Sequence, residues 1–405
     1  MKKSIISLLS LSALAVIGCT GTATVSEDGV DVLTNKDIYD EGDLTEIACD
    51  FKVYPLIADE PIDDIGGIKF FGDKAFARNG NDNKILCFDN YRMYAVLDKQ
   101  GNGPGEYNSI SDFSYDQATN ILNIPLLHDS IILEYNAQTM EYLGKRRVNF
   151  VIQNMRNVGD KVLYNGRSMK EYNKIDSEKG TGYQEAYFSV ILADKNENDL
   201  MNKSTVLSEQ NYLHTLMYGS PQVFYVSPVN LCYSLPGYVN RIVSFNDDSI
   251  TTLYRFRLAS INPPAKYTDG DYSKFANVTE FYISWITDMQ KEPAPEEIYN
   301  IIVDDGTISF LMRYYPEGIL SSGASLYWVH DKSGTKAYKS LRIPGLKQEI
   351  QPTGAHDNRN VAIIENLGED AIDSSAKMSP VAQQILDAMK KQKYDNPVLV
   401  EFRFK

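Results

Sequence analysis

Short segments in which apolar and polar residues alternate recur from residue 45 onward. In segment 254–258, Tyr, Phe and Leu alternate with two arginines, and segments 131–135 and 308–312 are similar runs. A period of two is typical of β-strands that bury one face, whereas a helix repeats every 3.6 residues. The turns between these runs are rich in Asn, Asp and Gly, as at residues 79–83. Many short strands with close turns predict an all-β fold, which could be a sandwich, a barrel or a propeller.

Composition narrows the class of protein further. Hydrophobic residues make up 43% of the 405 residues, so there is enough apolar material for a core and the chain as a whole is not disordered. Tyrosine is abundant, with 27 Tyr against 16 Phe and 2 Trp, and it suits half-buried strands whose hydroxyl groups reach water. The formal net charge is −14. This charge argues against binding to nucleic acid, because phosphate backbones are bound by clustered Lys and Arg.

The first eighteen residues have the features of a secretory signal peptide. Two lysines precede a mostly apolar run over residues 5–17, which is too short to span a bilayer as a helix, since that takes about 20 residues. Residues 16–19 read Val-Ile-Gly-Cys and resemble a bacterial lipobox. We therefore expect residues 1–18 to be removed and Cys19 to be acylated, which makes the protein an outer-membrane lipoprotein of the cell envelope, on either face. The alternative is an ordinary signal peptide in which Cys19 has no special role.

Residues 19–44 are strongly acidic and contain few apolar side chains. They carry seven Asp or Glu against a single lysine, Lys36. That composition predicts a flexible tether, which would hold the domain away from an anionic membrane surface. Residues 45–405 then form the folded domain.

Two segments break the strand pattern and are predicted to be helices at the periphery of the domain. The first has an apolar stripe at helical spacing: Phe275, Val278, Tyr282, Trp285 and Met289. In the second, Ser379 is the predicted N-cap and Pro380 the first helical residue, since proline is favoured at that position. Its apolar face holds Val381, Ile385 and Met389.

The C-terminal segment 398–404 is the best patterned strand of the chain. Val398, Val400, Phe402 and Phe404 share one face, and Glu401 and Arg403 share the other. A strand at the end of the chain must pair with another strand. In a closed propeller its partner comes from the N-terminal end of the domain, near residues 47–56, so that only short edges remain.

A loop sequence carries a resemblance to a known family. Residues 101–107 read Gly-Asn-Gly-Pro-Gly-Glu-Tyr. This resembles the six-bladed β-propeller lipoprotein family of Bacteroidetes, related in shape to NHL-type propellers, whose inter-blade loop reads G-x-G-P-G-E-Y. The lipobox, and the Asp-Asn-Pro at residues 395–397 before the last strand, also fit. The resemblance implies a six-bladed β-propeller over the mature domain, with the two helices inserted or peripheral.

The same loop has a structural and a functional interpretation. Gly101, Gly103 and Gly105 allow positive φ angles, Pro104 fixes a bend, and Glu106 can accept backbone N–H groups. The alternative is a phosphate cradle, which requires a helix after the glycines. Here a proline interrupts the glycines and a strand-like sequence follows. We therefore interpret it as a structural inter-blade loop, made of Gly101, Gly103, Pro104, Gly105, Glu106 and Tyr107.

Residues that could carry chemistry are few. His128, His330 and His356 each precede an aspartate, but neighbours on a strand point to opposite faces, so each dipeptide is a poor catalytic dyad by itself. If these histidines converged on the propeller axis, they could bind a metal ion or take part in catalysis. The sequence contains no H-E-x-x-H, G-x-S-x-G or P-loop string. We expect no cofactor, no metal and no assigned catalytic residue.

The cysteines of the mature chain fit structural burial. Cys49, Cys87 and Cys232 are an odd number at scattered positions, which is no disulfide framework, and they form no C-x-x-C pair that would suggest zinc.

Three function classes remain. The first is a binding or scaffold module, which presents a propeller face to a peptide, glycan or protein partner and reaches the membrane through its lipid anchor. The second is an enzyme, a lyase or hydrolase of polysaccharide or peptide, with its catalytic residues scattered over the blades. The third is a structural assembly factor, which would have an exposed apolar patch instead of a concave polar pocket. The sequence favours the first class, because catalytic strings are missing.

Overall fold

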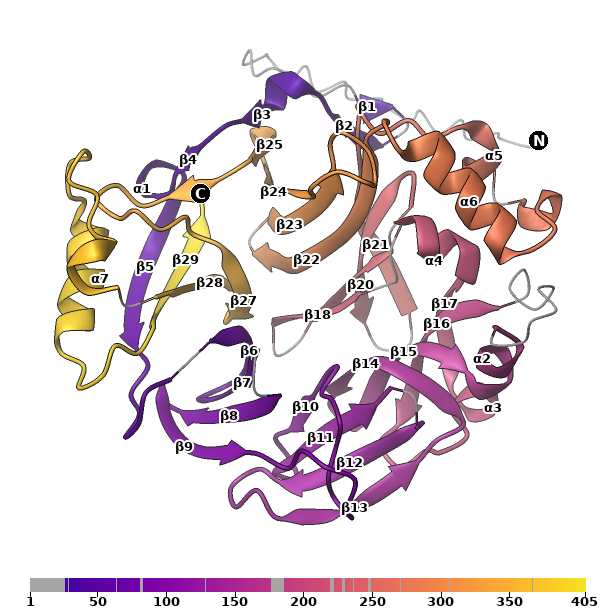
Figure 1. The fold of residues 1–405 in the computed structure, drawn as a ribbon, viewed down its shortest axis with the longest axis horizontal. Coiled ribbons are helices and arrows are strands. Elements are labelled where there is room, and N and C mark those ends of the chain that lie inside the picture. Colours follow the sequence, from indigo (N-terminus) through magenta and orange to yellow (C-terminus); the bar gives the residue numbers. More distant parts are fainter. Residues whose placement is uncertain are drawn as a thin grey trace, which may run out of the picture.

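The computed structural model is a wheel of β-sheets around a central axis (Figure 1). It describes residues 26–27, 29–62, 64–80, 83–127, 129–175, 186–218, 222–227, 230–235, 237–246, 249–269, 271–304, 306–365 and 367–405. The predicted signal peptide and Cys19 lie outside these residues, as does His128. Six sheets of four or more strands form the blades of a six-bladed β-propeller, which confirms the predicted fold class.

Blades 1 to 3 are four-stranded antiparallel sheets whose strands follow one another along the chain. Blade 1 contains β6 (Ile65–Phe71), β7 (Lys74–Asn79), β8 (Lys84–Asp89) and β9 (Arg92–Leu97). Blade 2 contains β10 (Ser114–Asp116), β11 (Ile121–Leu126), β12 (Ile131–Asn136) and β13 (Tyr142–Arg147). Blade 3 contains β14 (Phe150–Val158), β15 (Lys161–Ser168), β16 (Tyr187–Asp194) and β17 (Thr205–Asn211).

Blades 4 to 6 complete the wheel. Blade 4 contains β18 (Gln222–Ser227), β19 (Asn230–Leu235), β20 (Asn240–Asn246) and β21 (Ser249–Leu258). Blade 5 contains β22 (Ala294–Asp304), β23 (Thr307–Tyr315), β24 (Ala324–Asp331) and β25 (Gly334–Tyr338). Blade 6 contains β27 (Pro352–His356), β28 (Arg359–Ile364), β29 (Val398–Phe404) and β5 (Ala48–Pro55).

Blade 6 closes the ring with strands from both ends of the domain. The C-terminal strand β29 lies between β28 and the N-terminal strand β5, and Val400 pairs with Val53. The predicted pairing of segment 398–404 with residues near 47–56 is therefore confirmed. The first five residues of β29 are buried on both faces, including Glu401, because blade 6 packs against its neighbours on both sides.

The burial of each strand depends on its place in the blade. Residues 308–312 of β23, in the middle of blade 5, are all buried. The outermost strand β13 instead alternates half-buried and exposed residues along its length. Blades pack face to face, so inner strands bury both faces and only outer strands show a clean period of two.

The prediction of a flexible tether over residues 19–44 is wrong for residues 30–43. Strand β2 (Val30–Leu33) pairs with β21, β3 (Ile38–Tyr39) with β25, and β4 (Gly42–Asp43) with β26 (Leu341–Arg342). Figure 1 shows this segment, in indigo, running along the rim of the wheel. Two short elements, β1 (Ser26–Glu27) and the 3₁₀ turn Asn35–Asp37, accompany it, and α1 (Leu44–Ile47) leads into β5.

Buried apolar residues and paired acidic residues fix this N-terminal strap, residues 29–47. Val30, Val32, Leu33 and Leu44 are buried. Asp31 accepts hydrogen bonds from the Tyr254 hydroxyl at 3.0 Å and the Thr335 hydroxyl at 2.9 Å, and Asp43 caps α1 by accepting the Thr45 N–H. The acidic residues thus bind partners in the fold, which composition alone does not reveal.

The two predicted helices are the longest in the described part of the chain. In α7 (Pro380–Lys390), the Ser379 side chain accepts the N–H of Ala382, as expected of an N-cap, and Ile385 and Met389 are buried. In α6 (Val278–Met289), the buried stripe is Phe281, Trp285 and Met289, whereas Tyr282 is 50% exposed. The sequence predicts the stripe through Tyr282, because Tyr282 lies four residues after Val278 and three before Trp285. Phe281 is buried because it lies one turn from Trp285 and packs on Phe275.

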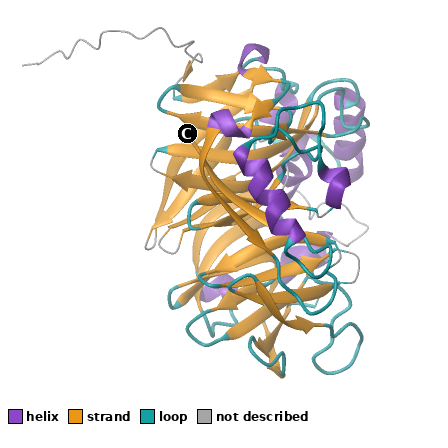
Figure 2. Ribbon diagram, turned by 90° about the vertical axis from the view of Figure 1, so that its left-hand side faces the viewer, coloured by secondary structure: helices purple, strands orange, loops and turns teal. Residues whose placement is uncertain are grey.

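The remaining helices are short and lie at the periphery of the β-sheets, as Figure 2 shows. They are α2 (Met169–Ile175), α3 (Leu200–Lys203), α4 (Tyr212–Tyr218) and α5 (Ala265–Thr268), with 3₁₀ turns at Tyr272–Lys274 and Gly368–Ala371. Within the described residues, no helix combines the length and the apolar character needed to cross a membrane. Cys87 is buried and Cys49 half-buried, and both are free thiols.

Candidate functional site

A cavity of about 280 Å³ lies where the inner strands meet at the propeller axis. Its walls come from β6 and β7 of blade 1, β14 of blade 3, β22 of blade 5 and β27 of blade 6, together with the loop that leads into β10. Figure 1 shows that the first strand of each blade is its innermost strand. Residues of four blades therefore line one space. We call this space the axial cavity.

A buried aspartate organises the wall of the axial cavity. Asp112 is 6% exposed and forms an ion pair with the Lys69 ammonium. Its other oxygen, Oδ2, accepts the Arg156 guanidinium at 3.1 Å and the Met155 N–H at 2.9 Å. Charged hydrogen bonds of this kind are what keep a buried carboxylate in place. The cluster joins blades 1 and 3 to the loop before blade 2.

The two cations around Asp112 are held by further contacts. Lys69 Nζ donates to the Phe113 carbonyl at 2.9 Å and lies 4.2 Å from the centre of the Phe113 ring. Arg156 Nη1 also donates to the Met155 carbonyl at 2.6 Å. A third cation, Arg78, is exposed and donates from Nη1 to the Ile110 carbonyl at 3.1 Å.

The electrostatics of the cavity are unusual for such an acidic protein. Burial and the neighbouring Arg156 lower the pKa of Lys69 to about 7, although Asp112 opposes this shift. Burial acts to raise the pKa of Asp112, but the charges of Lys69 and Arg156 outweigh it and the pKa is lowered. Among the described lining residues, three cations face one carboxylate, a net charge of +2 when Lys69 is protonated. A strongly shifted pKa in a concave site marks a candidate functional site.

Neutral polar groups complete the lining. Asn154, Asn300 and Thr353 border the axial cavity. Asn300 Nδ2 donates to the Pro352 carbonyl at 2.6 Å. The Thr353 hydroxyl oxygen is buried and has no hydrogen-bond partner among the described residues. Such a hydroxyl can still donate to or accept from a ligand.

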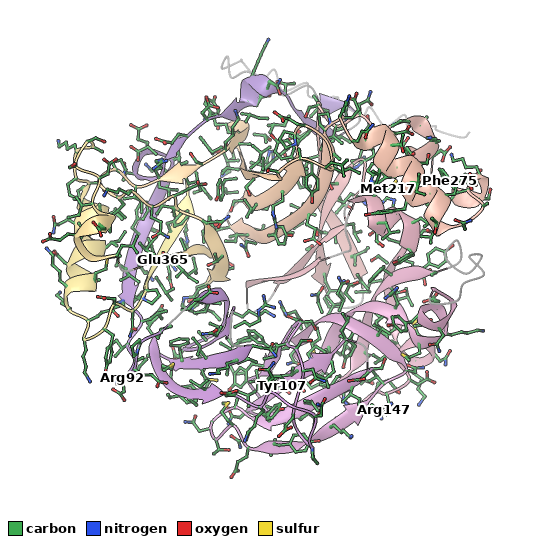
Figure 3. All side chains as sticks on the ribbon, viewed as in Figure 1. Arg92, Tyr107, Arg147, Met217, Phe275 and Glu365 are labelled. Atoms are coloured by element: carbon green, nitrogen blue, oxygen red, sulfur yellow. The ribbon has the colours of Figure 1, made fainter. Side chains whose placement is uncertain are left out.

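A second cavity of about 390 Å³ adjoins the axial cavity at the seam between blades 6 and 1. Thr353 lines both, and Asp64 and Ile65 of the second cavity are followed directly by Gly66 and Gly67 of the first. Four exposed carboxylates and no cation lie among its lining residues: Asp64, Glu349, Glu365 and Asp395. We call it the acidic cavity, and Figure 3 marks Glu365.

Of the three candidate histidines, the structure describes His330 and His356, and these two do not meet. His330 on β24 lies at the rim, where its Nδ1 is 3.1 Å from Asp31 Oδ2 of the N-terminal strap. His356 on β27 lies 2.6 Å from Glu401 Oε1 through its Nδ1, and it stacks on Phe70. Neither histidine lines the axial cavity. Searching the described residues finds no group of three or more His, Cys, Asp or Glu placed to hold a metal ion.

The glycine-rich loop connects β9 of blade 1 to β10 of blade 2. Gly101 N–H donates to the Tyr107 carbonyl at 3.1 Å, and Glu106 accepts the Gly103 N–H at 2.7 Å. The buried Tyr107 hydroxyl donates to the Leu97 carbonyl at 3.0 Å. Pro104 is exposed. Within this connection, residues 101–107 do not line the axial cavity, and Figure 3 labels Tyr107 among the blades.

We expect Gly105→Ala to lower the free energy of unfolding by about 1–2 kcal/mol, because Gly105 has a φ of 73° and a side chain there is strained. The new Cβ would also lie 2.5 Å from the Tyr142 ring. The matched control is Gly144→Ala, since a Cβ at Gly144 meets nothing within 4 Å. Equilibrium denaturation in urea measures the free energy of unfolding of both variants. Equal stabilities of the two variants would contradict the structural role of the loop.

Sequence reasoning missed the residues that build the axial cavity: Lys69, Arg78, Asp112 and Arg156. One feature of the sequence points to Lys69. Lys69 interrupts an apolar run at residues 68–71, Ile-Lys-Phe-Phe, and a lysine is almost never buried without a partner. No motif links it to Asp112, which is 43 positions away.

Comparisons with known proteins agree with the fold. A family model described as 6-bladed beta-propeller, DUF5128, matches residues 23–282. No curated protein matches the chain. Among solved structures, an exported protein of Bacteroides fragilis NCTC 9343 is similar with a TM-score of 0.63 and 15% identity, over 91% of this chain and 99% of that one.

A second solved structure is more distant. A member of the duf4221 family from Bacteroides vulgatus ATCC 8482 has a TM-score of 0.43 and 11% identity, over 89% of this chain and 98% of that one. The first of these likenesses supports the fold alone, and the family match extends over more than half of the chain. The chain therefore belongs to the DUF5128 family of 6-bladed beta-propellers.

Proposed function

We propose that this protein is an exported lipoprotein of the outer membrane whose propeller binds a peptide, glycan or protein partner at the axial cavity. The observation that carries the proposal is the cavity itself, where a buried charge cluster and neutral polar groups from several blades converge. Sites for ligands are concave, with a few well-placed polar groups. A volume of about 280 Å³ suits a terminal group or one side chain of a larger partner.

A crosslinking experiment in cells tests this proposal. A photoreactive amino acid at Ser111, which is exposed and lines the axial cavity, is expected to capture the partner. The matched control places the same amino acid at Ser333, an exposed position in the β24–β25 turn of blade 5. Capture from Ser111 alone supports the proposal. Equal capture from both positions, or none from Ser111, contradicts it.

The anchoring part of the proposal rests on the lipobox-like residues 16–19. Cys19→Ala removes the thiol that would carry the acyl chains, and several acyl chains on one residue make membrane binding durable. We expect the unmodified protein in the membrane fraction and the variant in the soluble fraction, measured by immunoblotting after cell fractionation. The same distribution for both would mean that Cys19 carries no anchor.

One observation favours the alternative of an enzyme. Burial lowers the pKa of Lys69 to about 7, the range in which general bases and amine nucleophiles work at neutral pH. Turnover of a polysaccharide or peptide that disappears in Lys69→Met would support this alternative. Binding without turnover of any such substrate leaves the binding module as the function.

A further inference from the structure

We infer that the axial cavity binds the free carboxylate of a peptide C-terminus, with the peptide body running into the acidic cavity. This inference rests on the proposed function and names the ligand class of the same site. Three observations support it: the cations of the axial cavity, the size of that cavity, and the negative charge of the acidic cavity that adjoins it.

The axial cavity has unused capacity for an anion. Asp112 neutralises one of the three cations, and Lys69 and Arg156 share its oxygens. Arg78 forms no ion pair among the described residues, and its contact with the Ile110 carbonyl uses one of five N–H donors. Arg78 is also exposed and lines the cavity, so an incoming carboxylate can reach it. Arginine binds a carboxylate through two parallel hydrogen bonds.

The glycines of β6 keep the site open. A Cβ at Gly67 would meet nothing within 4 Å, and its φ is 138°. Gly67 therefore leaves room beside the cavity where a side chain would stand. Backbone and the side chains of Asn154, Asn300 and Thr353 offer hydrogen-bond partners to peptide amides. The Thr353 hydroxyl is still unpaired among the described residues.

The acidic cavity selects against ligands that carry several negative charges. Its four exposed carboxylates would repel a sulfated glycan or a polyphosphate, whereas they attract a lysine or arginine side chain. Because the two cavities adjoin at Thr353, a ligand that spans both carries a carboxylate at one end and neutral or basic groups behind it. A peptide C-terminus with a basic residue upstream has this charge pattern.

Calorimetry on the full-length protein in detergent tests the inference with two probes. These are the N-acetylated peptide Ala-Lys-Ala-Ala with a free C-terminal carboxylate, and the same peptide with a C-terminal amide. We expect the carboxylate form to bind at least about tenfold more tightly, because a hydrogen bond to a charged group contributes that much or more. Arg78→Gln should remove this preference and Arg78→Lys should restore part of it.

The matched control for Arg78 is Arg92→Gln. Arg92 lies in β9 of the same blade, and its side chain is 58% exposed at the rim of the wheel (Figure 3). This variant should keep the full preference for the carboxylate.

An independent readout is proton uptake on binding of the peptide acid. Lys69, whose pKa is lowered to about 7, should gain a proton when a second anion enters, so the binding enthalpy above pH 7 should depend on the buffer.

Several outcomes would overturn the inference. They are equal affinity for the acid and amide peptides, no heat with either peptide, and tighter binding of inorganic phosphate or of acetate than of the peptide acid. Each leaves the proposed binding function standing if Ser111 still captures a partner in cells. Failure of the Ser111 crosslink alone, with peptide binding retained, would instead contradict the proposed cellular function.

Discussion

Asp112→Asn is expected to lower the free energy of unfolding by about 3–5 kcal/mol, the cost of removing one partner from a buried ion pair. Asp112 is 6% exposed and is the counterion of both Lys69 and Arg156. Asparagine has the same shape but no charge, so both cations would lose their compensation in a poorly solvated place. The Met155 N–H would also lose a charged acceptor.

Equilibrium unfolding in guanidinium chloride measures this effect. The matched control is Asp116→Asn, four residues further along the chain, because Asp116 pairs with a single lysine, Lys195, at 2.6 Å. Asp116 is also 6% exposed and accepts the Ala118 N–H at 3.1 Å, but it is the counterion of one cation instead of two. We therefore expect the control to lose about 1.5–3 kcal/mol, the range for a hydrogen bond to a charged group. Equal losses in the two variants would show that the Asp112 cluster is no special link between blades.

A second substitution distinguishes lost charge compensation from lost packing. Adding Lys69→Met to Asp112→Asn removes one of the two uncompensated cations while keeping an apolar side chain of similar length. Replacing buried ions by apolar groups is often neutral or stabilising. We therefore expect the double variant to be more stable than Asp112→Asn alone. If it is less stable, the two residues act independently and packing explains the loss.

The architecture could be predicted from the sequence because its signals are local. The alternation at Tyr254, Phe256 and Leu258 corresponds to a strand with those three side chains buried. The Ser379–Pro380 pair begins a helix where it was expected. Even the closure of the ring followed from one well-patterned strand at the chain end, because an unpaired strand edge is not tolerated.

The N-terminal strap and the axial cavity could not be predicted in this way. The strap is acidic, and its few apolar residues, such as Val30 and Val32, are buried only because blade 4 offers β21 as a partner. The axial cluster joins Lys69 and Arg156 through Asp112, and each step spans 43 or 44 positions. Only the closed ring of blades brings these residues together, so no local pattern carries the information.

Glu401→Gln tests the seam where blade 6 meets blade 1, and its effect should depend on pH. Glu401 is 1% exposed and its Oε1 accepts the Tyr91 hydroxyl at 2.9 Å and the His356 Nδ1–H at 2.6 Å. Tyr91 comes from blade 1 and His356 from blade 6. Burial acts to lower the pKa of His356, but the hydrogen bond and charge of Glu401 outweigh it, so this pKa is raised above 6.5.

The sign of the pH dependence follows from this shift. A histidine whose pKa is raised in the folded state stabilises the fold fully below its unfolded value of 6.5, and this stabilisation is lost as the pH rises through the folded value. Glutamine keeps an acceptor for both hydrogen bonds but removes the charge. We expect a loss of about 2–3 kcal/mol at about pH 5.5, in the range for a hydrogen bond between charged groups, and a smaller loss at about pH 8.5.

Urea denaturation at both pH values separates this charge effect from a general weakening of the seam. Glu317→Gln serves as the control, because Glu317 is exposed and should give no loss at either pH. A Glu401→Gln loss that is the same at both values would mean that protonation of His356 does not contribute to the stability of the seam. A loss that grows toward low pH instead makes the His356–Glu401 pair a charged link between blades 6 and 1. Its strength then depends on the acidity of the compartment in which the propeller works.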